Sequence, residues 1–225
     1  MLPAGFFTRV TGRPFSSPRE TTRAYNVVIF GETGVGKSSL INLITGLHQA
    51  KTSPDVDSCT ERNQDYEVTI ADRKFKIWDT AGLNGGTFSR IHAAIADRNL
   101  RRFLSKLHKK GELDLLIYCV RASRTTQALV RHYKKFYSSV CKRSVPVVVI
   151  VTCLENTPGE MDSWWQRNVG NFGKLGMVFA GHACVTTIAD DPGDTASLRA
   201  RREYSGRAVR SLIYENCRPH KLHTY

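Results

Sequence analysis

A glycine-rich segment near the N-terminal end of the chain places the strongest limit on the fold. It reads GETGVGKSS at residues 31–39 and fits the pattern G-x-x-x-x-G-K-[ST]. The segment follows YNVVIF at 25–30, an apolar run that predicts a buried strand. It precedes KSSLINLITG at 37–46, which predicts a helix ended by Gly46. A strand, a glycine-rich turn and a helix in this order predict a phosphate-binding loop.

The residue types in this loop suit a chain of phosphates with Mg²⁺. Glycines let the backbone turn tightly, so that successive amide N–H groups and the helix N-terminus point at the anion. The ammonium of Lys37 can reach the β- and γ-phosphates, and the hydroxyl of Ser38 suits Mg²⁺, which takes few protein ligands. We expect the nucleotide to contact Glu32, Thr33, Gly34, Val35, Gly36, Lys37, Ser38 and Ser39.

Beyond this loop, short apolar runs alternate with longer segments of helical periodicity. We expect strands at 25–30, 66–70, 73–80, 113–120, 145–152 and 182–188, and helices at 37–46, 89–110, 126–141, 159–173 and 195–216, the last capped by Thr195. Strands separated by helices predict a mainly parallel six-stranded sheet with helices on both faces, a three-layer α/β/α fold. A hairpin between 66 and 79 adds one antiparallel edge strand.

A second motif, WDTAGL at 78–83, follows the hairpin. Asp79 stands at the end of a predicted strand, where it can hold the Mg²⁺ shell through water. Gly82 can offer its backbone N–H to a γ-phosphate. Ligands of such sheets bind at the carboxyl ends of the strands, so this motif and the phosphate loop are expected to meet there.

The polar segment between the two motifs, residues 51–68, is where a nucleotide switch needs a threonine. That threonine senses both the γ-phosphate and Mg²⁺. Thr60, a few residues before the hairpin, is the preferred candidate, and Thr52 is the alternative.

With these motifs the chain resembles a GTPase G domain. Within that group it is similar to the branch of septins, chloroplast import-receptor (Toc) GTPases and immunity-associated nucleotide-binding proteins. The resemblance rests on GETGVGKSSLIN, on SCT before the hairpin and on DTAGL. It implies GTP or GDP and Mg²⁺ as ligands and a G domain at 24–217. A flexible basic extension is expected at 1–23 and a short tail at 218–225.

The resemblance also bears on catalysis. Leu83 stands where Ras-like proteins place the glutamine that orients the attacking water, so hydrolysis should be slow without another group. CVRASRTTQ at 119–127 resembles a segment whose basic residue faces the nucleotide of a partner across a G-domain dimer. Arg124 would match that residue, Arg121 less well, and a plain surface arginine is the alternative.

Base recognition is the least regular part of the pattern. The usual Asn/Thr-Lys-x-Asp is replaced by Thr152-Cys153-Leu154-Glu155. Glu155 retains a carboxylate for the guanine N1–H and N2–H₂ groups, whereas adenine would present an acceptor to it. Cys153 replaces the lysine that covers the ring, and Thr152 can brace the neighbouring loop.

Two other assignments stay open at the base site. Glu155 can instead be an exposed loop carboxylate while Trp164 or another residue covers the base. The last motif of the family, usually Ser-Ala-x, has HACVTTIAD as its only placement here, and this matches poorly. In it Thr186 and Thr187 could touch the base or the ribose.

The chain carries a net charge of +13, concentrated in two helical segments. These are Arg98, Arg101, Arg102, Lys106, Lys109 and Lys110 in one, and Arg199, Arg201, Arg202, Arg207 and Arg210 in the other. Solvated helix faces are one explanation, and an acidic partner, either an anionic membrane surface or an acidic protein, is the other. No aromatic-rich RNA-binding signature accompanies the charge, which argues against nucleic acid.

The six cysteines form no C-x-x-C pair, so free thiols in a reducing compartment are expected. We therefore expect a cytoplasmic protein, with peripheral membrane association allowed by its charge. The leading function is a GTP-binding switch with slow Mg²⁺-dependent hydrolysis, assisted by a homodimer across the nucleotide face. A GTP-binding interaction module with negligible hydrolysis and a P-loop ATPase are the alternatives.

Overall fold

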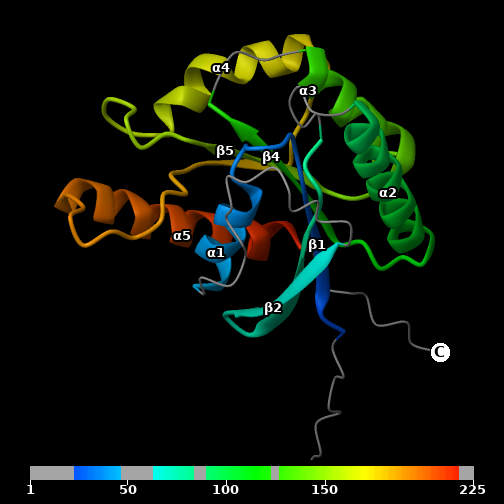
Figure 1. Cartoon of the computed structure of the whole chain (residues 1–225), viewed down its shortest axis with the longest axis horizontal. Helices are drawn as coiled ribbons and strands as arrows, with labels where there is room; N and C mark the ends of the chain where they lie inside the picture. Colours follow the sequence, from blue (N-terminus) through cyan, green and yellow to red (C-terminus); the bar gives the residue numbers. More distant parts are fainter. Residues whose placement is uncertain (1–22, 47–62, 84–89, 123–126, 218–225) are drawn as a thin grey trace, which may run out of the picture.

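The computed structural model describes residues 23–46, 63–83, 90–122 and 127–217. They form one six-stranded sheet in the order β2-β3-β1-β4-β5-β6. Figure 1 shows this sheet at the centre of the molecule, with helices around it. The strands are β1 (Tyr25–Phe30), β2 (Gln64–Ile70), β3 (Arg73–Asp79), β4 (Leu115–Arg121), β5 (Val147–Thr152) and β6 (Gly181–Cys184). All neighbours pair in parallel except the hairpin of β2 and β3, which pairs antiparallel at the edge. The predicted sheet and its one antiparallel edge strand are confirmed.

The burial of each strand follows from its place in the sheet. Every residue of β1 and β5 is buried, as in parallel strands covered on both faces. The edge strand β2 instead has mostly exposed and half-buried positions, and Tyr66 and Val68 pack against the core. The continuous apolar runs therefore lie at the centre and the polar run lies at the edge.

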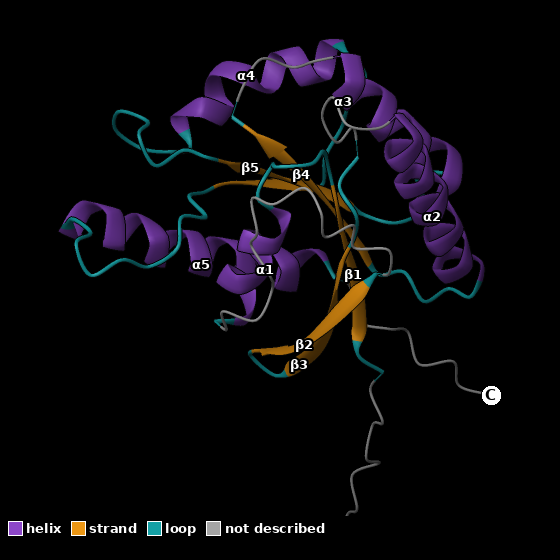
Figure 2. Ribbon diagram, viewed as in Figure 1, coloured by secondary structure: helices purple, strands orange, loops and turns teal. Residues whose placement is uncertain are grey.

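Helices cover both faces of the sheet (Figure 2). They are α1 (Lys37–Thr45), α2 (Arg90–Lys109), α3 (Gln127–His132), the π-helical η1 (Tyr133–Val140), α4 (Ser163–Lys174) and α5 (Ala196–Asn216). Two separate apolar clusters show the layering. One joins the sheet to α1 and α5 through Ile41 and Val209, and the other joins it to α2 and η1 through Leu104 and Phe136. The three-layer α/β/α prediction is confirmed.

The helix predicted over 126–141 differs from the structure in kind. Its α-helical part ends at His132, and wider π-helical turns follow, so that the N–H of Cys141 donates to Phe136 O five residues earlier, at 3.1 Å. Tyr133 lies at the junction and is buried, and its hydroxyl donates to Val178 O at 2.7 Å. This contact with a distant segment has no signal in the local sequence.

Some predicted boundaries also move by a few residues. The helix expected from 159 begins at Ser163, and the strand expected over 182–188 ends at Cys184. The start of α5 is as expected, because the Thr195 side chain accepts a hydrogen bond from Leu198 N at 3.2 Å.

The five cysteines within the described residues are free. Four are buried, and burial raises the pKa of Cys119 to about 12, so this thiol stays neutral at physiological pH. Cys59 lies outside the described residues. Within the same described part of the chain, no helix combines the length and the apolar character needed to cross a membrane.

Candidate nucleotide-binding site

The phosphate loop connects β1 to α1 at the carboxyl edge of the sheet. Gly34 and Gly36 adopt φ values of 76° and 88°, the left-handed region that favours glycine. Gly31 is required for another reason, since an added Cβ would lie 2.3 Å from Cys119 O on the neighbouring strand. Gly36 is the N-cap of α1 and supplies no side-chain cap, so the first amides of the helix remain available to an anion.

Lys37 lies folded over this loop. Its ammonium donates to Gly31 O at 3.3 Å and to Glu32 O at 3.0 Å, and the side chain is buried. Burial lowers the pKa of Lys37, and the neighbouring Cys119 and Asp79 oppose that shift. A desolvated cation at a helix N-terminus is well placed to attract a phosphate chain.

Ser38 and Asp79 meet beside Lys37. The Ser38 hydroxyl donates to one carboxylate oxygen of Asp79 at 2.9 Å. The other oxygen, Oδ1, is buried and has no hydrogen-bond partner among the described residues. Burial raises the pKa of Asp79, while the Ser38 hydrogen bond and the Lys37 charge oppose this.

This donor set fits Mg²⁺. A hydroxyl and a carboxylate with an unpartnered buried oxygen are hard ligands of the type that Mg²⁺ takes, directly or through water. The described residues contain no group of three or more His, Cys, Asp or Glu that could hold a metal alone. Ser38 and Asp79 would therefore share such an ion with water and with phosphate oxygens.

The segment after β3 is fastened to the phosphate loop. Thr33 N donates to Leu83 O at 2.8 Å, and Leu83 N donates to Gly31 O at 3.0 Å. Gly82 lies so close to Thr33 that an added Cβ would be 2.3 Å from Thr33 Oγ1. The two motifs that the sequence placed at one edge of the sheet are thus in direct contact.

The Leu83 side chain points away from that contact. It is 1% exposed and belongs to the apolar cluster that contains Phe30 and Leu104. The backbone amide and carbonyl of Leu83 are both bound to the phosphate loop, and its apolar side chain cannot orient a water molecule. The carboxylate oxygen Oε1 of Glu32, the second residue of the loop, lies 4.0 Å from His132 Nδ1.

Thr152 is a brace for the loop. It is fully buried, and its hydroxyl lies 2.7 Å from Val35 O and 3.2 Å from Val120 O, both of them acceptors. These contacts occupy the side chain that the sequence pattern placed among the nucleotide contacts. The next residue, Cys153, has a φ of 64°, which turns the chain sharply out of β5.

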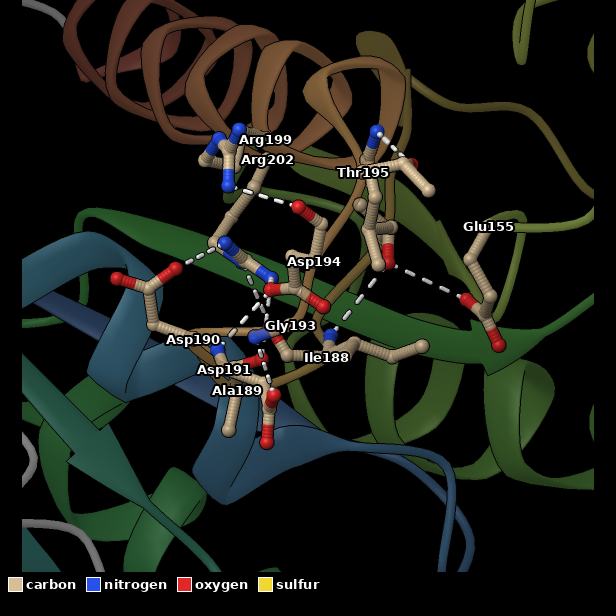
Figure 3. Close-up of polar contacts among 12 residues, drawn as sticks. Glu155, Ile188, Ala189, Asp190, Asp191, Gly193, Asp194, Thr195, Arg199 and Arg202 are labelled. Carbon is tan, nitrogen blue, oxygen red and sulfur yellow. Dashed lines mark hydrogen bonds and ion pairs between the residues drawn. The ribbon is translucent and has the colours of Figure 1, made fainter.

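Glu155 and Thr186 bring the two expected base-reading segments together. Thr186 Oγ1 donates to Glu155 Oε2 at 3.2 Å, and Ile188 N donates to Thr186 Oγ1 at 3.4 Å (Figure 3). The neighbouring Thr187 lies beside Gly36, since an added Cβ there would be 3.0 Å from Thr187 Oγ1. The carboxylate is therefore bonded to the same segment that contacts the phosphate loop.

Two arginines of α5 organise these segments, and sequence reasoning missed them. Arg201 donates to the carbonyl oxygens of Leu154 (3.1 Å), Thr157 (2.8 Å) and Gly159 (2.8 Å). Arg202 donates to the carbonyl oxygens of Ile188 (3.1 Å) and Ala189 (3.0 Å) and pairs with Asp190 and Asp194 (Figure 3).

For Arg201 and Arg202 these contacts correct the solvated-face explanation, whereas Arg199 and Arg207 are exposed as that explanation expects. Arg210 is engaged as well, at Ile44 O (3.0 Å) and Leu43 O (3.1 Å). Nothing in the helical spacing of 199–210 distinguishes an arginine that clamps a loop from one in water.

The remaining candidate residues either lie at other places in the fold or lie outside the described residues. Trp164 packs on the core near Phe172, with ring centroids 6.3 Å apart. Arg121 is the exposed last residue of β4. Thr60, Thr52 and Arg124 lie outside the described residues.

Comparison with known proteins agrees with this geometry. GTPase Der of Thermotoga petrophila is 42% identical over 139 residues, which cover 62% of this chain and 30% of that protein. Translocase of chloroplast 125 of Physcomitrium patens is 31% identical over 104 residues, 46% of this chain and 9% of that protein. The chain thus spans about a third or less of these relatives.

A solved structure shows the same fold. Era, crystallised with MgGDPNP and a segment of 16S ribosomal RNA, superposes with a TM-score of 0.60 at 16% identity, over 88% of this chain and 58% of that one. The family model described as 50S ribosome-binding GTPase matches residues 26–153. Because that match extends over more than half of the chain, the protein belongs to this family and contains a GTP-binding G domain.

Proposed function

We propose that the protein is a nucleotide-controlled switch that binds GTP with Mg²⁺ and hydrolyses it slowly. The observation that carries this proposal is the contact of Ser38 with Asp79 beside the buried Lys37, with one carboxylate oxygen left for a metal shell. Phosphoryl transfer depends mainly on positioning and on neutralising charge, and these groups supply both. Membership of the narrower branch with septins and Toc GTPases remains part of this proposal.

Each residue has a defined part in the reaction. Lys37 and the amides of Gly34–Ser39 hold the phosphates, and the N–H of Gly82 binds the γ-phosphate. Mg²⁺, when bound through Ser38 and Asp79, neutralises charge on the phosphate oxygens. Thr60 completes the response to the γ-phosphate, and Glu155 selects guanine. Because Leu83 is buried in the core, no side chain at that position orients the attacking water.

Slow hydrolysis should therefore respond to a second protomer. We expect the single-turnover rate to rise with protein concentration, because Arg124 would then act across a G-domain dimer. Arg124→Ala should abolish the rise and leave GTP binding unchanged. A rate independent of concentration would remove the dimer from the proposal, and no turnover at any concentration would favour an interaction module without hydrolysis.

Asp79→Asn tests the metal site. We expect about 10- to 100-fold weaker GTP binding in Mg²⁺, since a hydrogen bond to a charged group contributes roughly 1.5–3 kcal/mol. In EDTA the variant and the unaltered protein should bind alike. Asp65→Asn, on the exposed edge strand, is the matched control and should change the GTP affinity neither in Mg²⁺ nor in EDTA. An equal loss with and without Mg²⁺ would mean that Asp79 supports the loop rather than the ion.

A further inference from the structure

One exposed face of α2 carries a row of basic side chains. Arg98, Arg101, Arg102, Lys106 and Lys109 recur at helical spacing and are all exposed, and we call them the α2 basic stripe. Together with Ser105 they line an open depression of about 490 Å³. The helix lies at the outer edge of the molecule (Figure 1).

The charge of this stripe is not compensated by its surroundings. The only acidic residue of α2 is Asp97, and Lys135 of η1 already binds it at 2.5 Å. Residues 127–144, which contain η1, include no acidic residue and add the exposed cations Arg131 and Lys134. Within the described part of the chain, no salt bridge involves a member of the stripe. The result is a positive field that favours a polyanionic partner.

The N-terminal end of the same face is apolar. Ile91 is 71% exposed and lies two turns before Arg98, and Ile95 is 36% exposed and lies about one turn before it. A nucleic-acid backbone offers such side chains nothing to pack against, whereas the acyl boundary of a lipid surface does. The aromatic residue of α2, Phe103, packs edge-on against Trp78 at 4.9 Å, so it is not presented for stacking on bases.

We propose that this face of α2 docks on a membrane surface that contains anionic phospholipids. The guanidinium groups of the stripe bind lipid phosphates, a task for which their planar forks are suited. Ile91 and Ile95 enter the interface beside them. The proposal uses no residue of the nucleotide site, so its test is separate from that of the proposed GTPase function.

The test is binding of the full chain to vesicles, measured by co-sedimentation. We expect binding to equal parts of phosphatidylserine and phosphatidylcholine, and little binding to phosphatidylcholine alone. Arg98→Gln/Arg101→Gln/Arg102→Gln should weaken binding by about 100-fold, because each basic residue near an anionic surface contributes roughly a fivefold factor. Ile91→Ser/Ile95→Ser should weaken it by about tenfold.

The matched control is Lys74→Gln/Arg167→Gln/Lys174→Gln, which removes the same charge from exposed sites on β3 and α4. It should retain nearly all binding, and every variant should keep the thermal midpoint and the GTP affinity of the unaltered protein. Equal losses in the control would show that net charge, rather than this face, attracts the membrane. The chain could instead bind duplex RNA and not anionic vesicles, with the RNA binding lost in the stripe variant. That result would make nucleic acid, rather than lipid, the partner of this face. Either result would overturn the proposal.

Discussion

Replacing Lys37 with alanine is expected to lower the affinity for GTP by 100-fold or more. The Lys37 side chain is buried at the N-terminus of α1. Its ammonium donates hydrogen bonds to two carbonyl oxygens of the loop, Gly31 O and Glu32 O. Phosphates would exchange those neutral acceptors for charged ones, and each such bond contributes roughly 1.5–3 kcal/mol. Two of them account for a loss of this size.

Calorimetry with GTP, GDP and ATP in Mg²⁺ measures this effect. The exposed Lys174, on α4, gives a control, since Lys174→Ala removes the same charge far from the loop. Burial lowers the pKa of Lys37, which means that its charge costs the folded state free energy. The thermal midpoint without nucleotide should therefore not fall in Lys37→Ala. A less than threefold change in GTP affinity would show that the phosphates do not reach this residue.

Replacing Glu155 with alanine is expected to reduce the preference for GTP over ATP by about 100-fold. A site that hydrogen-bonds a ligand rejects an analogue strongly, because its polar groups would otherwise be left unpaired. Thr186 donates to this carboxylate at 3.2 Å and so holds it in one position before the base arrives. Thr186→Val should accordingly produce a smaller loss of preference in the same direction.

Competition of GTP and ATP for a fluorescent guanine nucleotide measures the preference. Glu160→Ala, an exposed carboxylate a few residues along the chain, is the control and should leave the preference unchanged. Glu155→Ala should keep most of the affinity for the phosphate chain, because Lys37 and the loop amides remain. An unaltered preference in Glu155→Ala would mean that another residue reads the base.

The rigidity of this base site is supplied from α5. Arg201 clamps the loop that carries Glu155, and Arg202 clamps the loop after β6. Both loops have little regular secondary structure. Without the arginines, binding of the ligand would have to order them, at an entropic cost. Two adjacent residues of α5 thus hold the loop that follows β5 and the loop that follows β6 in place before the ligand binds.

The sequence predicted the fold well, including the strand, the glycine turn and the helix at its N-terminal end. The glycine pattern of 31–39 predicts a tight turn between a strand and a helix, and in the structure this segment connects β1 to α1. The alternation of apolar runs and helical segments predicted mainly parallel strands, because parallel neighbours need crossover connections. The sequence did not predict that the second half of the 126–141 helix is π-helical, as η1 is. It also placed some ends of elements wrongly, since β6 ends at Cys184 and not at 188.

The sequence by itself determined the six-stranded sheet, the phosphate loop and the meeting of its two motifs at the carboxyl edge. These follow from short-range spacing and from the alternation of strands and helices along the chain. Only the tertiary structure decided that Thr152 braces Val35, a residue 117 positions earlier, and that Arg201 clamps Leu154, 47 positions earlier. It also decided that Leu83 enters the core. Side-chain partners so distant along the chain depend on how layers pack, and periodicity along a single segment carries no information about that packing.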